Sequence, residues 1–187
     1  FCMFLVFVMY RFRLLLIVSP TGTGAISFSR NGNSAKTWAL FRSLLTLAAA
    51  SYVATLAANE PVNFVPPWIP RLGAQFSLHA DNMSAMLSLL TAIIFPIVII
   101  ANWNKEVDRP NAFYGLMLLS QAGLMGVFLA YDALLFYFFW ELALIPVYFL
   151  CSKWGGEKRI PVTFKFFIYT FVGSLMMLAA IVYLSLQ

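Results

Sequence analysis

The sequence predicts an all-α protein that crosses a membrane several times, and three observations support this fold class. Of its 187 residues, 62% are hydrophobic and 10% are charged, whereas a soluble domain averages about 25% charged residues. Apolar runs of roughly 20 residues recur, which is the length that a helix needs to cross the ~30 Å apolar core of a bilayer. Tryptophans stand at the edges of these runs, as in the aromatic belts of membrane proteins: Trp38, Trp68, Trp103 and Trp154.

Charge and loop length exclude other classes. The net charge is +5, but the basic residues stand at the ends of apolar runs, where they orient helices in a membrane; we therefore expect no nucleic-acid partner. No loop is long enough to hold a soluble catalytic domain. Cys2 and Cys151 are expected near opposite membrane faces, too far apart for a disulfide. Because the sequence has no Cys/His cluster and no nucleotide-binding glycine motif, we expect neither a metal nor a cofactor in this chain.

Residues 1–35 form an atypical N-terminal segment. Residues 1–18 are apolar but contain Arg11 and Arg13, which project from different faces of a helix and raise the cost of insertion. This stretch is a first transmembrane helix, a signal-like segment or a foreign start. Residues 19–36 are rich in Ser, Thr, Gly and Asn and predict a loop. Since the chain begins with Phe1 and stops at Gln187 directly after an apolar run, we expect a fragment.

Residues 36–187 predict a transmembrane helical bundle with spans at about 38–58, 83–101, 112–130, 133–151 and 164–186, so that the whole chain has about six spans if the first is real. Residues 59–81 hold four prolines and predict an irregular loop at the headgroups. The end of the bundle with more Lys and Arg is predicted to be cytoplasmic. Arg71 stands alone on the other side, whereas the cytoplasmic side carries Arg30, Lys36, Lys105, Arg109, Lys153, Lys158 and Arg159.

Small and polar residues predict specific helix contacts. Ala122, Gly126 and Ala130 recur at a spacing of four, so this face allows another helix to approach closely. Gln121 lies near the middle of the same span and is expected to hydrogen-bond a neighbouring helix. Asp81 opens the span at 83–101, where it is expected to cap the helix N-terminus; a proton-carrying role is the alternative.

Glu141 is the main functional candidate. In residues 132–151, DALLFYFFWELALIPVYFLC, it is the one charged residue after Asp132, and nine residues of helix place it ~13–14 Å deep, near the midplane. An acidic residue there disfavours insertion by roughly 2.5–3.5 kcal/mol. A carboxyl that is kept despite this cost is a functional candidate.

The residues around Glu141 predict a polar pocket. Tyr137 and Tyr148 share a helical stripe with it, which should face other helices and not lipid. Pro146 has no N–H, so the carbonyl of Leu142 loses its helical partner and can hold a water next to the carboxyl.

Two interpretations of the Glu141 carboxyl follow from its chemistry. Burial raises the pKa of a carboxyl and a nearby cation lowers it again, so a carboxyl with a movable cationic partner can take up and release a proton. The alternative is a permanently protonated Glu141 in an interhelical hydrogen bond. Lys165 either extends to the cytoplasmic surface or faces the bundle, where it is a second titratable position on a proton route.

Three segments show a resemblance to a known family. GVFLAYDALLFYFFWELALIPVYFLCSKWGG (126–156), RIPVTFKFFIYT (159–170) and PPWIPRLG (66–73) resemble subunit M, the chain 4 homologue, of bacterial NADH-quinone oxidoreductase, respiratory complex I. The resemblance implies an antiporter-like fold of fourteen transmembrane helices, of which this chain supplies about the first six. It implies proton translocation in the bacterial inner membrane, among other membrane subunits of complex I and the lipid bilayer. The NADH, FMN, iron–sulfur clusters and quinone would be bound by other subunits.

The resemblance also implies roles for individual residues. Glu141 matches the Glu of the FFWE motif, which is essential to pumping in the family; its lysine partner there lies on the seventh helix, beyond this chain. Lys165 matches the Lys of KFFIYT and so a place on the proton route, and Asp81 matches a family Asp with a weaker claim. As a fragment, the chain is not expected to pump. The alternatives are a subunit of a multi-subunit sodium/proton antiporter or membrane-bound hydrogenase, and a non-transporting membrane scaffold.

Overall fold

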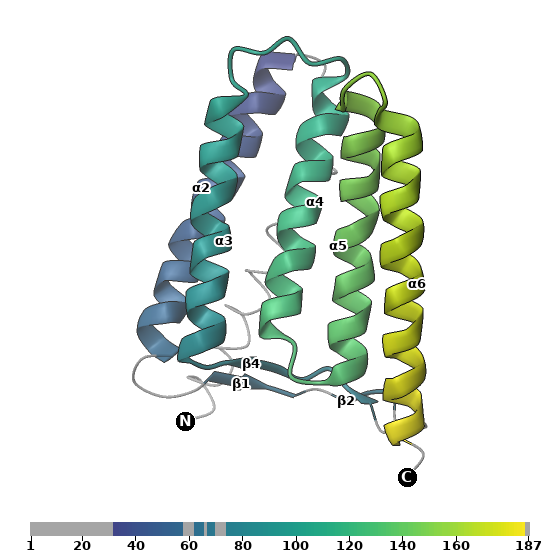
Figure 1. Cartoon of the computed structure of the whole chain (residues 1–187). Coiled ribbons are helices and arrows are strands. Elements are labelled where there is room, and N and C mark those ends of the chain that lie inside the picture. The colour runs from purple at the N-terminus through teal and green to yellow at the C-terminus, as the bar shows by residue number, and fades with distance from the viewer. Residues whose placement is uncertain (1–31, 58–61, 66, 70–73, 186–187) are drawn as a thin grey trace.

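Five long helices lie side by side and form the bundle (Figure 1). The computed structural model describes residues 32–57, 62–65, 67–69 and 74–185, so the predicted first span lies outside the described residues. The helices are α2 (Gly32–Ala57), α3 (Asn82–Ala101), α4 (Pro110–Leu129), α5 (Ala133–Trp154) and α6 (Arg159–Ser185). All 5 are long and apolar enough to cross a membrane. The predicted fold class, an all-α membrane protein with several spans, is thereby confirmed for the described residues.

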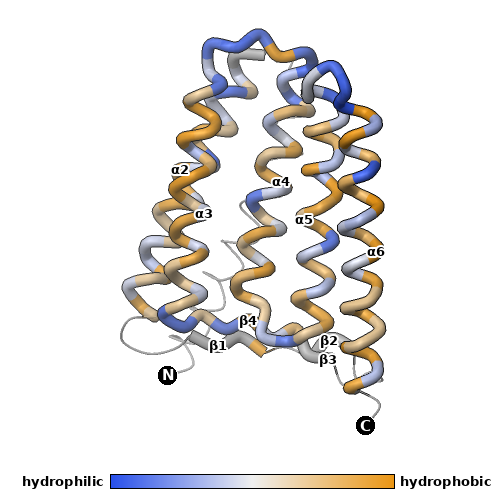
Figure 2. Tube along the Cα trace, in the orientation of Figure 1, coloured by the Kyte–Doolittle hydropathy of each residue, from blue (hydrophilic) through white to orange (hydrophobic). Residues whose placement is uncertain are grey.

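The helices extend beyond the apolar spans that predicted them. Residues 32–36, expected to be loop, belong to the first turn of α2, and α5 continues through Lys153 to Trp154. Helix α6 begins at Arg159, five residues before the predicted span. The reason is that hydropathy detects the stretch in contact with lipid, whereas helical hydrogen bonding continues into the polar interface. Figure 2 shows hydrophilic residues at the helix ends and isolated hydrophilic positions inside α4, α5 and α6.

Helix α4 lies at the centre of the packing. It contacts α2, α3 and α5, whereas α6 packs on α5. Consecutive helices from α3 to α6 run antiparallel, so each is joined to the next by a short connection (Figure 1). Helix α5 therefore lies between a well-packed part of the bundle and the peripheral α6.

The segment between α2 and α3 contains strands that the sequence analysis did not predict. Strand β1 (Val62–Phe64) pairs antiparallel with β4 (Leu78–Ala80), and β2 (Pro67–Ile69) pairs antiparallel with β3 (Ala74–Gln75). Residues of high strand propensity explain β1 and β2, and a proline is tolerated as the first residue of a strand, where β2 has it. Strands β3 and β4 lack such residues and form by pairing with them. The expectation of a loop without strands was wrong in this respect.

These strands cross one end of the bundle and connect to the turn between α4 and α5 (Figure 1). Leu78 forms an isolated antiparallel bridge with Ala130. The backbone N–H of Tyr131 donates to the carbonyl of Ser77 at 2.9 Å. The position at which α5 begins is therefore fixed by hydrogen bonds from outside the helix.

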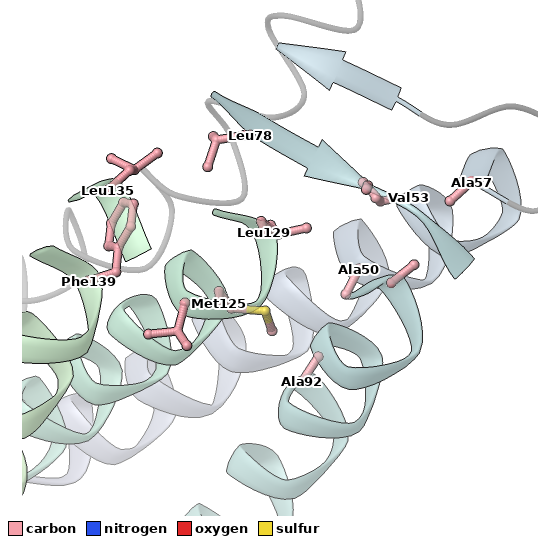
Figure 3. Packing of buried hydrophobic residues seen from close by; sticks show 12 residues of the cluster. Ala50, Val53, Ala57, Leu78, Ala92, Met125, Leu129, Leu135 and Phe139 are labelled. Atoms are coloured by element: carbon pink, nitrogen blue, oxygen red, sulfur yellow. The ribbon is translucent and has the colours of Figure 1, made fainter. Parts of the chain in front are cut away.

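The apolar core has two clusters. The larger one, near the strands, joins α2, α3, α4 and α5 and includes Val53, Met125, Leu129 and Phe139 (Figure 3). The smaller one, toward the other end, consists of Ala35, Ala39, Ile99, Tyr114 and Leu118. Along α2 and α4, buried polar residues separate the two clusters: Ser43, Thr46 and Gln121.

Candidate functional site

The start of α5 is fixed by a side-chain cap. The Asp132 carboxylate accepts hydrogen bonds from the backbone N–H groups of Leu134 at 2.8 Å and Leu135 at 3.2 Å, which satisfies N–H groups that a helix N-terminus otherwise leaves unpaired. Glu141 is the ninth residue of α5, about 12 Å along a helix that is about 32 Å long. The carboxyl thus lies well inside the apolar part of the span.

One face of α5 packs closely on α4. A Cβ atom added to Gly123 would lie 2.8 Å from the Cα of Ala143, and one added to Gly126 would collide with the Phe139 ring. Only glycine fits at such a contact, because it allows the two backbones to approach. The close approach predicted for the face of Gly126 is therefore confirmed. Gly123, which was not singled out in the sequence, forms the contact next to it.

Glu141 projects from the other side of α5. It is two residues from both Phe139 and Ala143, so it points about 180° away from the face that packs on α4. Tyr148, on the same stripe as Glu141, has its ring centroid 4.9 Å from that of Phe167 in α6. The stripe therefore faces α6, in agreement with the expectation that it faces a helix.

The carboxyl of Glu141 is half covered. Its Oε1 atom is buried and makes no hydrogen bond to any described residue. Tyr137 and Tyr148 are also half-buried, and Pro146 is buried. The apolar surroundings therefore leave a strongly polar atom without a partner from the described part of the chain, which is costly unless a further group pairs with it.

Ser174 of α6 lies level with Glu141. Because α5 and α6 run antiparallel, seven residues before Tyr148 and seven after Phe167 lead to Glu141 and Ser174 at the same height. Ser174 is 4% exposed, and its hydroxyl donates to the carbonyl of Phe171 at 2.9 Å. The serine oxygen can still accept a hydrogen bond. Ser174 was not among the residues predicted from the sequence, although a polar residue in the middle of an apolar span was the available signal.

Lys165 does not meet Glu141. It lies nine residues before Ser174, about 13–14 Å along α6 and on the opposite face of that helix. Lys165 is exposed, and Tyr169, one turn further, is 77% exposed. Within the described residues no ion pair joins Lys165 to Glu141. A role on a proton route would thus require a group that lies against the outer face of α6.

Asp81 caps α3, as predicted. Its carboxylate accepts the backbone N–H of Ser84 at 2.7 Å, and the Ser84 hydroxyl oxygen accepts the N–H of Asp81 at 3.0 Å, which together form a capping box. The hydrogen bond from the Ser84 backbone lowers the pKa of Asp81, helped by the Ser84 side chain and by the nearby His79. These bonds account for the residue as a cap, and the proton-carrying alternative stays a prediction.

Gln121 differs from its expectation. It is 0% exposed, yet neither its Nε2 nor its Oε1 hydrogen-bonds a described residue. The predicted interhelical hydrogen bond is therefore not formed within the described bundle. The buried hydroxyls of Ser43, Ser88 and Ser120 share this state. Since buried polar groups are normally hydrogen-bonded, these side chains are sites where a further group can pair with the middle of the bundle.

Metal-ligating and redox groups are sparse in the described residues. No group of three or more His, Cys, Asp or Glu side chains there could hold a metal ion. Cys151 is exposed near the end of α5, whereas Cys2 lies outside the described residues, so their predicted separation stays a prediction.

The five described helices that can span a membrane, one of them with an acidic residue inside it, have the features of a polytopic membrane subunit, and the structures that they resemble include antiporter-like membrane subunits. Comparisons with known proteins support this. Residues 130–187 match the family described as NADH:quinone oxidoreductase/Mrp antiporter, transmembrane, and the chain is a homologue of its subunit M and chain 4 members. The predicted resemblance to subunit M is thereby confirmed.

Two of the relatives that the chain matches are named as subunit M of different enzymes. F(420)H(2) dehydrogenase subunit M of Methanosarcina mazei is 40% identical over 173 residues, which are 89% of this chain and 35% of the relative. NADH-quinone oxidoreductase subunit M of Escherichia coli K12 is 40% identical over 139 residues, 70% of this chain and 27% of the relative. The chain thus spans about a third or less of the length of these curated relatives.

Solved structures show the same fold. A chain of respiratory complex I from Thermus thermophilus has a TM-score of 0.78 at 28% identity, over 89% of this chain and 34% of that one. A chain of a membrane-bound sulfane sulfur reductase has a TM-score of 0.79 at 19% identity, over 91% of this chain and 27% of the other. At that identity the second likeness supports the fold and does not distinguish among functions.

Proposed function

We propose that this chain is part of a proton-translocating membrane subunit of a respiratory NADH-quinone oxidoreductase, with Glu141 as the group that takes up and releases the proton. The observation that carries the proposal is the position of the carboxyl. It lies inside a membrane-spanning helix, with one oxygen buried and no hydrogen bond to the described residues. An ionisable group in such a place is most often functional.

The chemistry requires a second group. A cation that approaches the stripe of Glu141 stabilises the carboxylate and releases the proton, and withdrawal of the cation favours proton uptake. Ser174 lies at about the same height in α6, and in the proposed mechanism a small side-chain movement would let its oxygen accept a hydrogen bond from the protonated carboxyl. The described residues bring no cation to this stripe, so a lysine from a further helix is the proposed partner.

The assembly follows from the same proposal. Other membrane subunits and the lipid bilayer surround the chain, in the inner membrane of a bacterium. NADH, FMN, iron–sulfur clusters and quinone are bound by other subunits, and this chain holds no cofactor. Its contribution to the enzyme is proton movement, driven by electron transfer elsewhere in the complex.

The decisive experiment replaces Glu141 by glutamine in the complete membrane complex. Glu141→Gln keeps the shape and hydrogen bonding of the side chain but removes its titration. We expect a large loss of proton translocation in inverted membrane vesicles, with normal assembly. Glu157→Gln, which removes an exposed carboxyl between α5 and α6, is the control and should pump normally. Unchanged pumping in Glu141→Gln would favour the non-transporting scaffold.

A second candidate concerns the source of electrons. One relative that matches over 89% of the chain is named for F(420)H(2), and another that matches over 88% is named for NAD(P)H, so a complex with F(420)H(2) as the donor is the second candidate. Oxidation of NADH and of reduced F420 by membranes that contain the protein separates the two. The sodium/proton antiporter alternative predicts transport that depends on sodium, whereas the proposed function predicts transport that continues without it.

A further inference from the structure

A groove between α4 and α5 lies apart from Glu141. It encloses about 370 Å³ and is lined by Asn111, Gly115, Leu116 and Leu119 of α4 and by Phe149 and Lys153 of α5. A Cβ atom added to Gly115 would have no neighbour within 4 Å. The glycine therefore keeps space open here, in contrast to Gly123 and Gly126, which bring helices together.

The polarity of the groove changes with depth. Lys153 lies in the last turn of α5, with its Nζ 5.9 Å from the centroid of the Phe149 ring, and Asn111 is the second residue of α4. Leu116 and Leu119 lie deeper, the latter about 13–14 Å into α4. A cation and an amide at headgroup level above apolar residues match the order of groups in a phospholipid.

The rim of the groove is held together at its polar end. The Trp154 indole N–H donates to the carbonyl of Asp108 at 2.9 Å, and its ring contacts that of Phe113 with centroids 5.2 Å apart. These contacts connect the end of α5 to the start of α4. These contacts hold the two helices at a fixed distance at the polar end of the groove.

Charge favours an anionic occupant. Among the described residues that line the groove, Lys153 is the one that carries a charge. Around it, the same end of the bundle carries Lys105, Arg109, Lys158 and Arg159 against Glu106, Asp108 and Glu157. Basic pockets between membrane helices bind anionic lipid headgroups. We propose that this groove binds one anionic phospholipid, with its phosphate at Lys153 and an acyl chain along Gly115, Leu116 and Leu119.

The first test fills the groove with a larger side chain, in Gly115→Leu, and counts the lipids that stay bound. The native membrane protein is equilibrated with phosphatidylglycerol or with phosphatidylcholine, and retained lipids are counted by native mass spectrometry. We expect the unchanged protein to retain one more phosphatidylglycerol than phosphatidylcholine, and Gly115→Leu to lose it. Gly173→Leu is the matched control, because Gly173 of α6 also has no atom within 4 Å of an added Cβ; it should retain the lipid.

A second pair of variants tests whether the positive charge of Lys153 attracts the lipid, without adding volume to the groove. Lys153→Gln should weaken the binding of phosphatidylglycerol about fivefold, as expected for one basic residue next to an anionic lipid. Lys158→Gln, at an exposed position of the same end, should leave it within about twofold. Equal retention of both lipids by the unchanged protein would overturn the proposal. So would a loss of subunit assembly in Gly115→Leu without loss of lipid, since a partner helix would then occupy the groove.

Discussion

Helices α4 and α6 are both apolar enough to cross a membrane, but they are packed very differently. In an apolar stretch of 18 residues within each helix, 67% of the residues of α4 are buried, whereas 6% of those of α6 are. Helix α4 carries the glycines that meet α5, together with buried Ser120 and Gln121. Helix α6 instead exposes large side chains such as Met176 and Tyr169. Hydropathy thus identifies a membrane helix, whereas small residues identify its packed face.

Helix α5 separates these two regions, and Glu141 lies on the side of α6. The opposite side of α5 packs closely on α4 at Gly123 and Gly126, where an added Cβ atom would collide with Ala143 or Phe139. The proton exchange that we propose for Glu141 needs partners that can move, and Glu141 lies on the less buried side of α5, toward α6. The four predictions below test the contrast, starting with the largest expected effect.

Truncating a side chain on the face of α5 that packs on α4 should cause the largest loss of stability. Phe139 is 6% exposed and covers Gly126, so Phe139→Ala leaves a cavity between α4 and α5 and should cost about 3 kcal/mol. Phe164→Ala, at a position of α6 that is 54% exposed, should change stability by less than about 0.5 kcal/mol. Reversible unfolding in bicelles measures both variants. Equal costs would remove the distinction between the packed and the peripheral region.

Adding volume at the glycine contact should have the next largest effect. Gly123→Val places a side chain against the backbone of Ala143, so α4 and α5 must separate, at about 1–3 kcal/mol. Gly173→Val on α6 meets no atom and has the same change in composition, which makes it the control. The two midpoints of thermal unfolding are compared. A tolerated valine at position 123 would show that the interface is loose there.

The comparison also explains how far the sequence predicts the structure. Five spans, the Asp81 cap and the close approach at Gly126 follow from local patterns, because length, capping and small-residue spacing are local properties. The pairing of β1 with β4 does not follow, because it joins residues distant in the chain. The stripe of Glu141 was expected to face a helix, but its neighbour could not be assigned before Tyr148 was seen against Phe167 of α6.

Removing a buried polar group that has no partner should raise the free energy of unfolding, whereas removing one that is hydrogen-bonded within its helix should lower it. The Gln121 amide is buried without a described partner, so Gln121→Met should stabilise the bundle by about 1–2 kcal/mol. The Thr46 hydroxyl donates to the carbonyl of Arg42 at 2.9 Å, so Thr46→Val should cost about 0.5–1 kcal/mol. Unfolding free energies measured in the same bicelles give both signs. A destabilised Gln121→Met would mean that the amide is hydrogen-bonded in the membrane, and the packed region would then be more polar than its residues alone indicate.

The smallest effect is expected at the start of α3, outside the packed region. The pKa of Asp81 is lowered from its ordinary 3.8, so the cap contributes to stability at any pH above about 3.8 and is lost as the pH falls through the lower pKa of the folded state. Exchange protection of the Ser84 amide, corrected for its intrinsic pH dependence, should be constant from neutral pH down to about pH 4 and should then decrease. Asp81→Asn keeps an acceptor for the same N–H but does not titrate, so its protection should not decrease in that range. If both proteins lost protection together, the cause would be a titration elsewhere, and the cap would not be the element that responds to acid.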